Sequence, residues 1–391
     1  MRIGILGQGV SGIFLALFLK NNNKDLDVTI IDKNSIPARK LLNTGNGRCN
    51  LANSDINEKS YNSPFVKNVV DAFNSEKIIE TLNKWGIFTR NFNTCIYPYS
   101  LSARSFADYL IILAKEAKIK FVNDENFLDY HLENNKIIVE TSKKKFTFDK
   151  FVFASGSNSA SFLGGSSSVI NCLEKHGYKI NTLKPGLAPI RTIELTKNAE
   201  NQKVKAKVTL IIDKKVIYEE TGEVLFKKDG LSGIAIFNCA SMIARSSKFK
   251  KATISLDLVP EYSFDEIYKI LLEHNSTSKC SVLNGFFTKT MSEYIRKEAG
   301  IKNLSSFTTS EIKKIAQKLK NFEFTYKETY NFENSQVTVG GVDLNQINEN
   351  FESKKEKNIY LIGEILDADG LCGGYNIMWA IASANQLAKN F

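Results

Sequence analysis

Three glycines near the start of the chain have the spacing of a phosphate-binding turn. Gly7, Gly9 and Gly12 form a G-x-G-x-x-G pattern, and Asp32 follows 20 positions after the last of them. In such a pattern the first glycine permits a tight turn, the second lets backbone approach a pyrophosphate, and the third lets a helix pack closely on a strand. An acid at this distance can hold a ribose hydroxyl. These residues predict a dinucleotide site, and NAD and FAD fit it equally.

Two apolar stretches flank this turn and predict the elements that hold it. RIGILG (residues 2–7) and DVTIID (residues 27–32) are typical of buried strands. Between them, apolar residues recur at helical spacing at Val10, Ile13, Phe14, Leu17 and Phe18. The N-terminus of such a helix presents free N–H groups and a positive dipole end to phosphates. The order of strand, turn, helix, strand and acid makes the prediction more specific than the glycines alone.

Length and composition are those of an ordinary globular protein with an excess of basic residues. The 391 residues suffice for two or three domains, and no apolar run reaches the roughly 18 residues of a membrane span. No signal-peptide pattern precedes the first apolar run, so we expect a cytoplasmic protein. The net charge of +10 fits an acidic partner such as RNA, and it equally fits a lysine-rich composition without a function.

Cysteine and histidine positions argue against a metal centre and against a local dithiol pair. The six cysteines are scattered with no C-x-x-C, and His131, His176 and His274 lie in different regions. We therefore expect no metal site and mostly structural thiols. Only one G-x-G-x-x-G is followed by an acid, so we expect no second dinucleotide domain.

The pattern of elements predicts an α/β domain that is interrupted and then resumed. Residues 1–186 and 336–391 alternate between strand and helix signals, and we predict that they form the nucleotide domain. Residues 187–255 and 321–335 alternate as strands do and predict a β-rich inserted domain. Residues 256–320 predict a small helical subdomain.

Three local expectations concern the nucleotide domain. We predict one amphipathic helix over residues 64–86 and a substrate-facing loop over residues 90–104, which contain Pro98 and several aromatics. We also predict a strand that is broken at Gly340–Gly341.

Five motifs, in order along the chain, resemble those of one known family. The BaiN/RdsA (YhiN-like) FAD-dependent oxidoreductases have a similar series of GQGVSG, RKLLNTGNGRCNLAN, GEVLFKKDGLSG, VTVGGVDL and GEILDADGLCGGYNIMWA. The resemblance covers essentially the whole chain. It departs at Ala154–Ser157, where A-S-G-S replaces A-T-G-G, and at Lys227–Lys228, which replaces a Thr–His pair. It implies FAD in a three-layer, Rossmann-like α/β domain that is interrupted by a β-barrel-like subdomain and a helical one.

The resemblance also implies roles for single residues. The turn from Gly7 to Gly12 would hold the pyrophosphate and Asp32 the adenosine ribose, while Glu364 and Asp367 would meet the ribityl chain or the pyrophosphate. The residues expected to bind the cofactor are Gly7, Gly9, Val10, Ser11, Gly12, Asp32, Lys33, Arg39, Lys40, Leu41, Gly45, Asn46, Gly47, Arg48, Cys49, Asn50, Ala154, Ser155, Gly156, Gly363, Glu364, Asp367, Gly373, Gly374, Tyr375 and Asn376.

Two branches of the family imply one type of reaction. One branch reduces a C=C bond conjugated to a carbonyl in bile-acid-like steroids, and the other reduces the C5=C6 bond of uridine in ribosomal RNA. In both, the flavin gives a hydride to the β-carbon and an acid gives a proton to the α-carbon. NADPH or NADH is the expected reductant, and Cys49, Tyr375 and Cys372 are the candidate acids. Our first prediction for the substrate is uridine in 23S rRNA.

Several alternatives stay open at this stage. A small-molecule enone substrate, an amine oxidase that releases hydrogen peroxide, and a non-catalytic flavoprotein that acts as an interaction factor are compatible with the same motifs. No RNA-binding signature such as that of an RRM supports the uridine prediction independently. For Cys49, a role as a small packed residue competes with the catalytic one.

Overall fold

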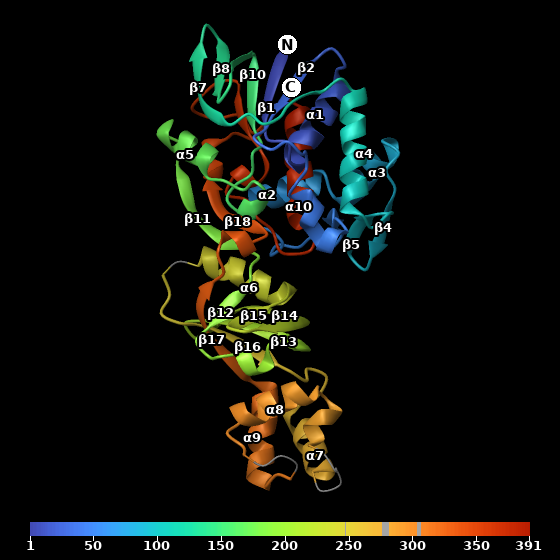
Figure 1. Cartoon of the computed structure of the whole chain (residues 1–391), viewed down its shortest axis with the longest axis vertical. Coiled ribbons are helices and arrows are strands. Elements are labelled where there is room, and N and C mark those ends of the chain that lie inside the picture. Colours follow the sequence, from blue (N-terminus) through green and yellow to red (C-terminus); the bar gives the residue numbers. More distant parts are fainter. Residues whose placement is uncertain (247, 276–280, 303–305) are drawn as a thin grey trace. The chain divides into compact units, whose positions relative to one another are not determined.

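The computed structural model describes residues 1–246, 248–275, 281–302 and 306–391, so that Cys280 lies outside the described residues. The chain forms two compact units. Met1–Pro185 and Ser335–Phe391 make the first unit, and Gly186–Asn334 make the second. In Figure 1 the first unit is coloured blue to green and red, and the second yellow-green to orange.

The first unit is built around a parallel sheet. Its five strands lie in the order β19-β10-β1-β2-β6, and each neighbouring pair is parallel. These strands are β1 (Arg2–Leu6), β2 (Asp27–Ile31), β6 (Lys120–Val122), β10 (Lys150–Phe153) and β19 (Ile359–Leu361). This sheet is the one that the apolar runs at the start of the chain predict.

Adjacent residues of β1 show what covers the two faces of this sheet. A Cβ atom added at Gly4 would lie 2.6 Å from the ring of Phe148, so the strand that holds Phe148 covers this face. Phe148 belongs to an antiparallel sheet of three strands, β7 (Phe127–Glu133), β8 (Lys136–Thr141) and β9 (Lys145–Phe148). Ile5 points the other way, because side chains alternate along a strand, and it faces Gly12 of helix α1 (Val10–Asn22). The unit therefore has three layers, as predicted.

Further helices complete the first unit. Helix α10 (Tyr375–Ala388) packs against α1, and α4 (Ala103–Glu116) also lies beside α1 (Figure 1). Residues 13–19 of α1 are all buried, which explains why this helix is apolar on every side. Helix α5 (Ser168–Lys175) packs against β7.

The second unit contains a closed antiparallel barrel. The strand order is β12-β15-β14-β13-β16-β17. The strands are β12 (Ile190–Thr192), β13 (Lys203–Ile212), β14 (Lys215–Lys227), β15 (Gly230–Ser232), β16 (Ala252–Asp257) and β17 (Phe322–Thr329). The helices of this unit are α6 (Ile234–Arg245), α7 (Phe264–His274), α8 (Lys289–Glu298) and α9 (Thr309–Lys320). The predicted fold class is confirmed.

One hydrophobic core joins the barrel and the helices of the second unit. It includes Phe226 and Phe324 from the barrel together with Leu271, Ile295 and Leu319 from α7, α8 and α9. The finer division of this region into a barrel and a separate helical subdomain stays a prediction. Among the described residues, no helix is both long enough and apolar enough to cross a bilayer.

Three local predictions for the first unit are wrong. Residues 64–86 form two helices, α2 (Pro64–Ala72) and α3 (Ser75–Lys84), because the Asn74 side chain caps α3 by accepting a bond from the Lys77 N–H. Residues 90–104 hold most of a hairpin, β4 (Thr89–Phe92) and β5 (Cys95–Pro98), in place of a loop, and β5 pairs with β3 (Ala52–Asn53).

The third wrong prediction is the break at Gly340–Gly341. Strand β18 (Val337–Val342) runs through both glycines and pairs with β11 (Ile180–Gly186). A Cβ atom at Gly340 would lie 2.3 Å from the Thr182 carbonyl oxygen. The glycine therefore permits a close approach of two strands and does not end one.

Candidate functional site

Four parallel strands of the first unit end at the same level. Leu6 of β1 pairs with Ile31 of β2 and with Phe153 of β10, and Phe153 pairs with Leu361 of β19. The loops that follow these strands therefore start at one edge, at Gly7, Asp32, Ala154 and Ile362. In open α/β sheets this carboxyl edge is where ligands bind.

The glycine turn after β1 has the geometry that its spacing predicts. A Cβ atom at Gly7, which has φ +113°, would lie 2.4 Å from the Ala154 carbonyl oxygen, and one at Gly12 would lie 2.0 Å from the Gly7 carbonyl oxygen. At Gly9, by contrast, a Cβ atom would meet nothing within 4 Å. Gly9 is also the N-cap of α1 and supplies no side-chain hydrogen bond to it. An open space therefore faces the uncapped N–H groups of α1, as a pyrophosphate requires.

Asp32 is held in a fixed orientation at the end of β2. Its Oδ2 accepts a hydrogen bond from the Gln8 N–H at 2.9 Å, and its Oδ1 accepts from the Asn34 N–H at 2.7 Å and from Asn34 Nδ2 at 2.9 Å. A carboxylate has about four acceptor positions, so it can still receive a ribose hydroxyl. The neighbouring Lys33 is exposed.

Two predicted ligands, Lys40 and Glu364, bind each other. Lys40 Nζ lies 2.6 Å from Glu364 Oε2 and also contacts Ser159 Oγ. Ser159 Oγ donates to Glu364 Oε1 at 2.6 Å, and the Thr338 N–H donates to the same oxygen at 3.0 Å. Gly156 lies close by, since a Cβ atom there would be 3.5 Å from Glu364 Oε2. This network ties together the loops that follow β2, β10 and β19.

The loop after β2 takes left-handed backbone conformations that suit its glycines. Gly45, Asn46, Gly47 and Cys49 have φ values of +55°, +54°, +79° and +62°. Arg39 and Arg48 are exposed, whereas Leu41 and Cys49 are buried in the core. Burial raises the pKa of the Cys49 thiol to about 12, and its hydrogen bond with Thr44 lowers this pKa by a smaller amount. Cys49 is therefore a packed, protonated thiol.

A second uncapped helix start lies at α10. Gly374 is its N-cap, with φ +99° and no side-chain cap. A Cβ atom at Gly374 would lie 2.7 Å from the carbonyl group of Ala52 and 2.7 Å from Asn50 Oδ1. Within the described part of the chain, Asn50 Oδ1 is buried without a hydrogen-bond partner. The loop of residues 41–53 and the start of α10 thus pack together around a buried acceptor without a partner.

The side chains of two residues at the start of α10 form hydrogen bonds within the protein. Asn376 Oδ1 accepts a bond from the Gly370 N–H at 2.9 Å, and its Nδ2 donates to the Gly370 and Leu371 carbonyl oxygens. The buried Tyr375 hydroxyl donates to the Asp55 carbonyl oxygen at 2.6 Å. Asn376 therefore shapes the glycine-rich loop. Asp367, in the same stretch, accepts a bond from Asn181 Nδ2 at 2.8 Å.

Sequence reasoning missed Cys95 and Tyr97 on β5. Cys95 Sγ lies 3.9 Å from the Gly373 carbonyl oxygen. The pKa of Tyr97 is raised by burial and by the neighbouring Cys95, and the nearby Arg48 charge opposes this rise. Cys372 also lies near enough to Tyr97 to raise its pKa slightly. The aromatic-rich segment 90–104 indicates this region, but only the pairing of β5 with β3 places these two side chains beside the glycine-rich loop before α10 (the α10 loop, residues 370–374).

Every residue of the predicted site lies in the first unit, which is Met1–Pro185 and Ser335–Phe391. The sequence model of the HI0933-like protein Rossmann domain matches residues 1–390. The chain belongs to this family. The predicted family resemblance is confirmed, and the HI0933-like match spans both units of the chain.

Three curated relatives of this HI0933-like protein are similar along their whole length. The 3-dehydro-bile acid delta(4,6)-reductase of Clostridium scindens is 28% identical, with 98% of this chain and 97% of the relative covered. The ribosomal RNA dihydrouridine synthase of Escherichia coli is 26% identical, with 99% and 96% covered. That of Haemophilus influenzae is 23% identical, with 97% and 96% covered.

Solved structures show a more distant likeness to the HI0933-like chain. A 3-ketosteroid delta1-dehydrogenase from Sterolibacterium denitrificans has a TM-score of 0.49 at 9% identity, covering 100% of this chain and 99% of that one. The quinol fumarate reductase FrdA of E. coli has a TM-score of 0.47 at 11% identity, covering 100% and 70%.

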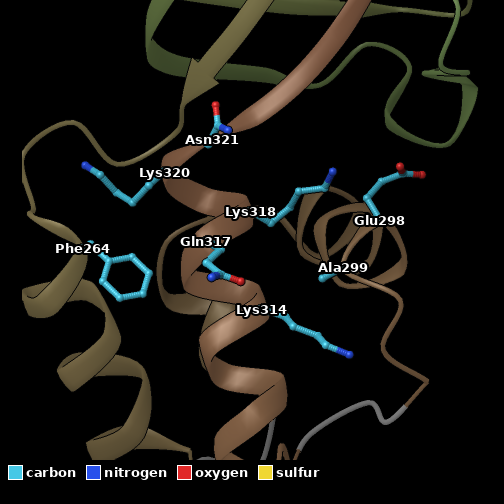
Figure 2. A pocket seen from close by; sticks show the side chains of 8 residues that line it. All are labelled: Phe264, Glu298, Ala299, Lys314, Gln317, Lys318, Lys320 and Asn321. Carbon is cyan, nitrogen blue, oxygen red and sulfur yellow. The ribbon is translucent and has the colours of Figure 1, made fainter.

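The second unit has a shallow basic cavity of about 530 Å³ that is open to solvent. Its lining includes Lys314 and Lys318 of α9, Phe264 at the start of α7, and Glu298 at the end of α8 (Figure 2). Figure 2 shows both lysines projecting from the same side of α9, with Lys318 extending towards Glu298 and Lys314 extending away from it. Lys320, at the edge of the cavity, is paired with Asp257 at 2.6 Å.

Proposed function

We propose that this protein is an FAD-dependent reductase of a C=C bond conjugated to a carbonyl, and that its substrate is uridine in 23S rRNA. The observation that carries the proposal is the similarity to two ribosomal RNA dihydrouridine synthases over at least 96% of each chain. When bound, FAD accepts two electrons from a reductant, for which we propose NADPH or NADH, and passes them to the substrate as a hydride.

The first unit has the features that FAD needs. The open space at Gly9 and the N–H groups of α1 suit the pyrophosphate, and Asp32 suits the adenosine ribose. The uncapped start of α10 and the unpaired Asn50 Oδ1 suit the flavin ring. The N–H groups at Gly374 and after it would stabilise negative charge on a bound flavin when it is reduced.

The general acid must contact the substrate, and this requirement distinguishes between the candidate residues. Cys49 is fully buried, and the Tyr375 hydroxyl is bonded to the Asp55 carbonyl oxygen. Cys372 and Tyr97 are half-buried beside the α10 loop, and both side chains carry an exchangeable proton. The Cys372 thiol donates a long hydrogen bond of 3.8 Å to Gln336 Oε1, which a substrate can replace more readily than the 2.6 Å bond of the Tyr375 hydroxyl. We therefore favour Cys372, with Tyr97 next to it, over Cys49 as the general acid.

This assignment is tested by reoxidation of the reduced enzyme. Cys372→Ala should keep its bound flavin and slow substrate-dependent reoxidation by about 10²-fold or more, the range of a general acid. Tyr97→Phe tests the neighbour in the same assay. Cys49→Ala is the matched thiol deletion and should change the rate little; a large loss there with an unchanged Cys372→Ala would reverse the assignment.

The basic cavity of the second unit supports an RNA substrate. Lys314 and Lys318 offer positive charge that backbone phosphates attract. The double variant Lys314→Gln, Lys318→Gln should bind RNA more weakly and lower the slope of log affinity against log salt by about 2. Lys269→Gln on α7, an exposed lysine paired with Glu273, is the control and should change neither quantity.

A small enone is the second candidate substrate, because the C. scindens relative is a bile acid reductase. The decisive experiment is mass mapping of ribosomal RNA from cells with and without the gene. A dihydrouridine that persists after deletion contradicts the RNA proposal. Reoxidation of the reduced protein by a steroid enone, with none by the RNA, would then establish the small-molecule alternative.

A further inference from the structure

Three metal-ligating side chains meet in the first unit, apart from the residues of the proposed cofactor site. Asp129 lies on β7, Cys172 lies on α5, and His176 follows the end of α5. Asp129 Oδ1 is 2.7 Å from His176 Nε2 and 3.3 Å from Cys172 Sγ. The three ligand atoms all lie within 4.8 Å of one another.

The local structure explains why these side chains converge. Cys172 and His176 are four residues apart and therefore share one face of the helical turn. This face is turned towards β7, on which Asp129 lies. The imidazole of His176 stacks on the Tyr130 ring, with the ring centroids 4.2 Å apart and the planes within 13°. The stack fixes the ring so that Nε2 points at Asp129.

The second nitrogen of the same ring has its own carboxylate. His176 Nδ1 lies 3.8 Å from Glu356 Oε1. This distance is that of an ion pair and not of a hydrogen bond, so Glu356 would have to move closer to act as the carboxylate that commonly supports a metal-bound histidine. Glu356 is held by the hydroxyl of Tyr178 at 2.9 Å. The Asp129 and Cys172 ligand atoms therefore lie near Nε2, and Glu356 lies on the Nδ1 side of the ring.

We propose that Asp129, Cys172 and His176 bind a zinc ion that fastens α5 to β7, with water as the fourth ligand. Zinc bonds of about 2.0–2.3 Å in a tetrahedron set the ligand atoms roughly 3.3–3.7 Å apart, so shifts below about 1 Å complete the site. The exposed side chain of Asp129, at 59%, leaves the fourth position open to solvent. Thiolate and imidazole ligands favour zinc over magnesium or calcium.

The chemistry of the thiol favours a metal ligand over a nucleophile. The Cys172 side chain is buried and donates a hydrogen bond to Asp129 Oδ1, an environment in which a thiol is unreactive by itself. The Asp129 oxygen bonds both the thiol and the imidazole, so the imidazole is not placed to activate the sulfur. On binding of a divalent cation, the Cys172 thiol would release its proton to solvent, and the cation would neutralise the thiolate and the Asp129 carboxylate together.

The test uses the full chain, stripped of metal with a chelator and then titrated with zinc chloride. We expect one zinc per chain by elemental analysis. We also expect that cobalt(II) in its place gives a thiolate-to-metal charge-transfer band. Zinc at about 100 times its Kd should raise the thermal midpoint by about 3–6 °C. Binding of less than 0.2 zinc per chain, or a cobalt spectrum without the thiolate band, overturns the proposal.

Variants separate this site from adventitious binding. Cys172→Ala should abolish the cobalt band, and the exposed, isosteric Asp129→Asn should weaken zinc binding at least tenfold without loss of folding. His131→Gln is the matched control, because His131 is an exposed histidine on the same strand that forms a weak ion pair with Glu133. A loss of zinc in His131→Gln as large as that in Asp129→Asn contradicts the proposal. Bound flavin should be the same in all of them, so the test is independent of the proposed reaction.

Discussion

The two helices that start on glycine in the first unit, α1 and α10, show how similar features arise in different ways. Both have a glycine N-cap, Gly9 and Gly374, and neither has a side-chain cap. At α1 the tight contact is local, since Gly12 packs on Gly7. At α10 it is long-range, since Gly374 packs on Ala52. Equivalent helix starts can therefore depend on neighbouring residues or on residues more than 300 positions away.

Two helices of the second unit, α7 and α9, provide the contrast, whereas α6 starts on Gly233 without a side-chain cap, as α1 and α10 start on glycine. Helices α7 and α9 each start with a capping box, formed by Ser263 with Glu266 and by Thr308 with Glu311. These side chains satisfy N–H groups that α1 and α10 leave free of side-chain caps. A capped start stabilises its own helix, and an uncapped start beside an open space is available to a ligand.

Gly12→Ala should have the largest effect, because its new Cβ atom would lie 2.0 Å from a backbone oxygen of the same turn. Overpacking usually costs about 1–3 kcal/mol and more where backbone must move, so we expect a loss above about 3 kcal/mol in the free energy of unfolding. Urea unfolding and flavin absorbance measure the two consequences. A variant with normal stability and normal flavin content would contradict the local packing described for α1.

Gly374→Ala should have the next largest effect. Its left-handed φ of +99° and the 2.7 Å approach to Ala52 should together cost about 2–4 kcal/mol. The control is Gly285→Ala in the second unit, where a Cβ atom would meet nothing within 4 Å, and its unfolding midpoint should be unchanged. Equal midpoints for the two variants would show that the long-range contact at α10 is unimportant.

Asn376→Ala removes the side chain that closes the loop before α10. The bonds to Gly370 and Leu371 would be lost, and their groups left unpaired, at a cost of about 1–3 kcal/mol in thermal or urea unfolding. Asn376→Asp keeps the acceptor and loses the donor, so it should fall between wild type and Asn376→Ala. A stable Asn376→Ala with an unshifted flavin spectrum would show that the loop holds its shape without this side chain.

Gly9→Ala should have the smallest effect on stability and a selective effect on the ligand. Since nothing lies within 4 Å of the new Cβ atom, we expect a change of less than about 1 kcal/mol in the free energy of unfolding. The methyl group would enter the space proposed for the pyrophosphate, so the Kd for FAD should rise about tenfold, or about 1.4 kcal/mol. Equilibrium titration of the apoprotein with FAD measures this, and an unchanged Kd would place the pyrophosphate elsewhere.

Sequence reasoning succeeded where a feature depends on neighbouring residues. The apolar runs of β1 and β2 and the three glycines of the turn are found where their spacing predicts. It failed where a long-range contact decides the outcome. The sequence predicts a strand break at Gly340, but this residue lies inside β18, where the absence of a side chain lets β11 approach closely. The sequence predicts a loop over residues 90–104, but most of this segment forms a hairpin that pairs with β3.

The sequence by itself determined the α/β class, the glycine turn and the acid after β2, because each depends on residues within a few turns of chain. Only the tertiary structure decided that Lys40 binds Glu364, that Gly374 packs on Ala52, and that Tyr97 stands beside the α10 loop. It also brought Asp129 to Cys172, 43 positions away, where composition predicts no metal site. Strand register and packing set these contacts, and no local pattern in the sequence encodes them.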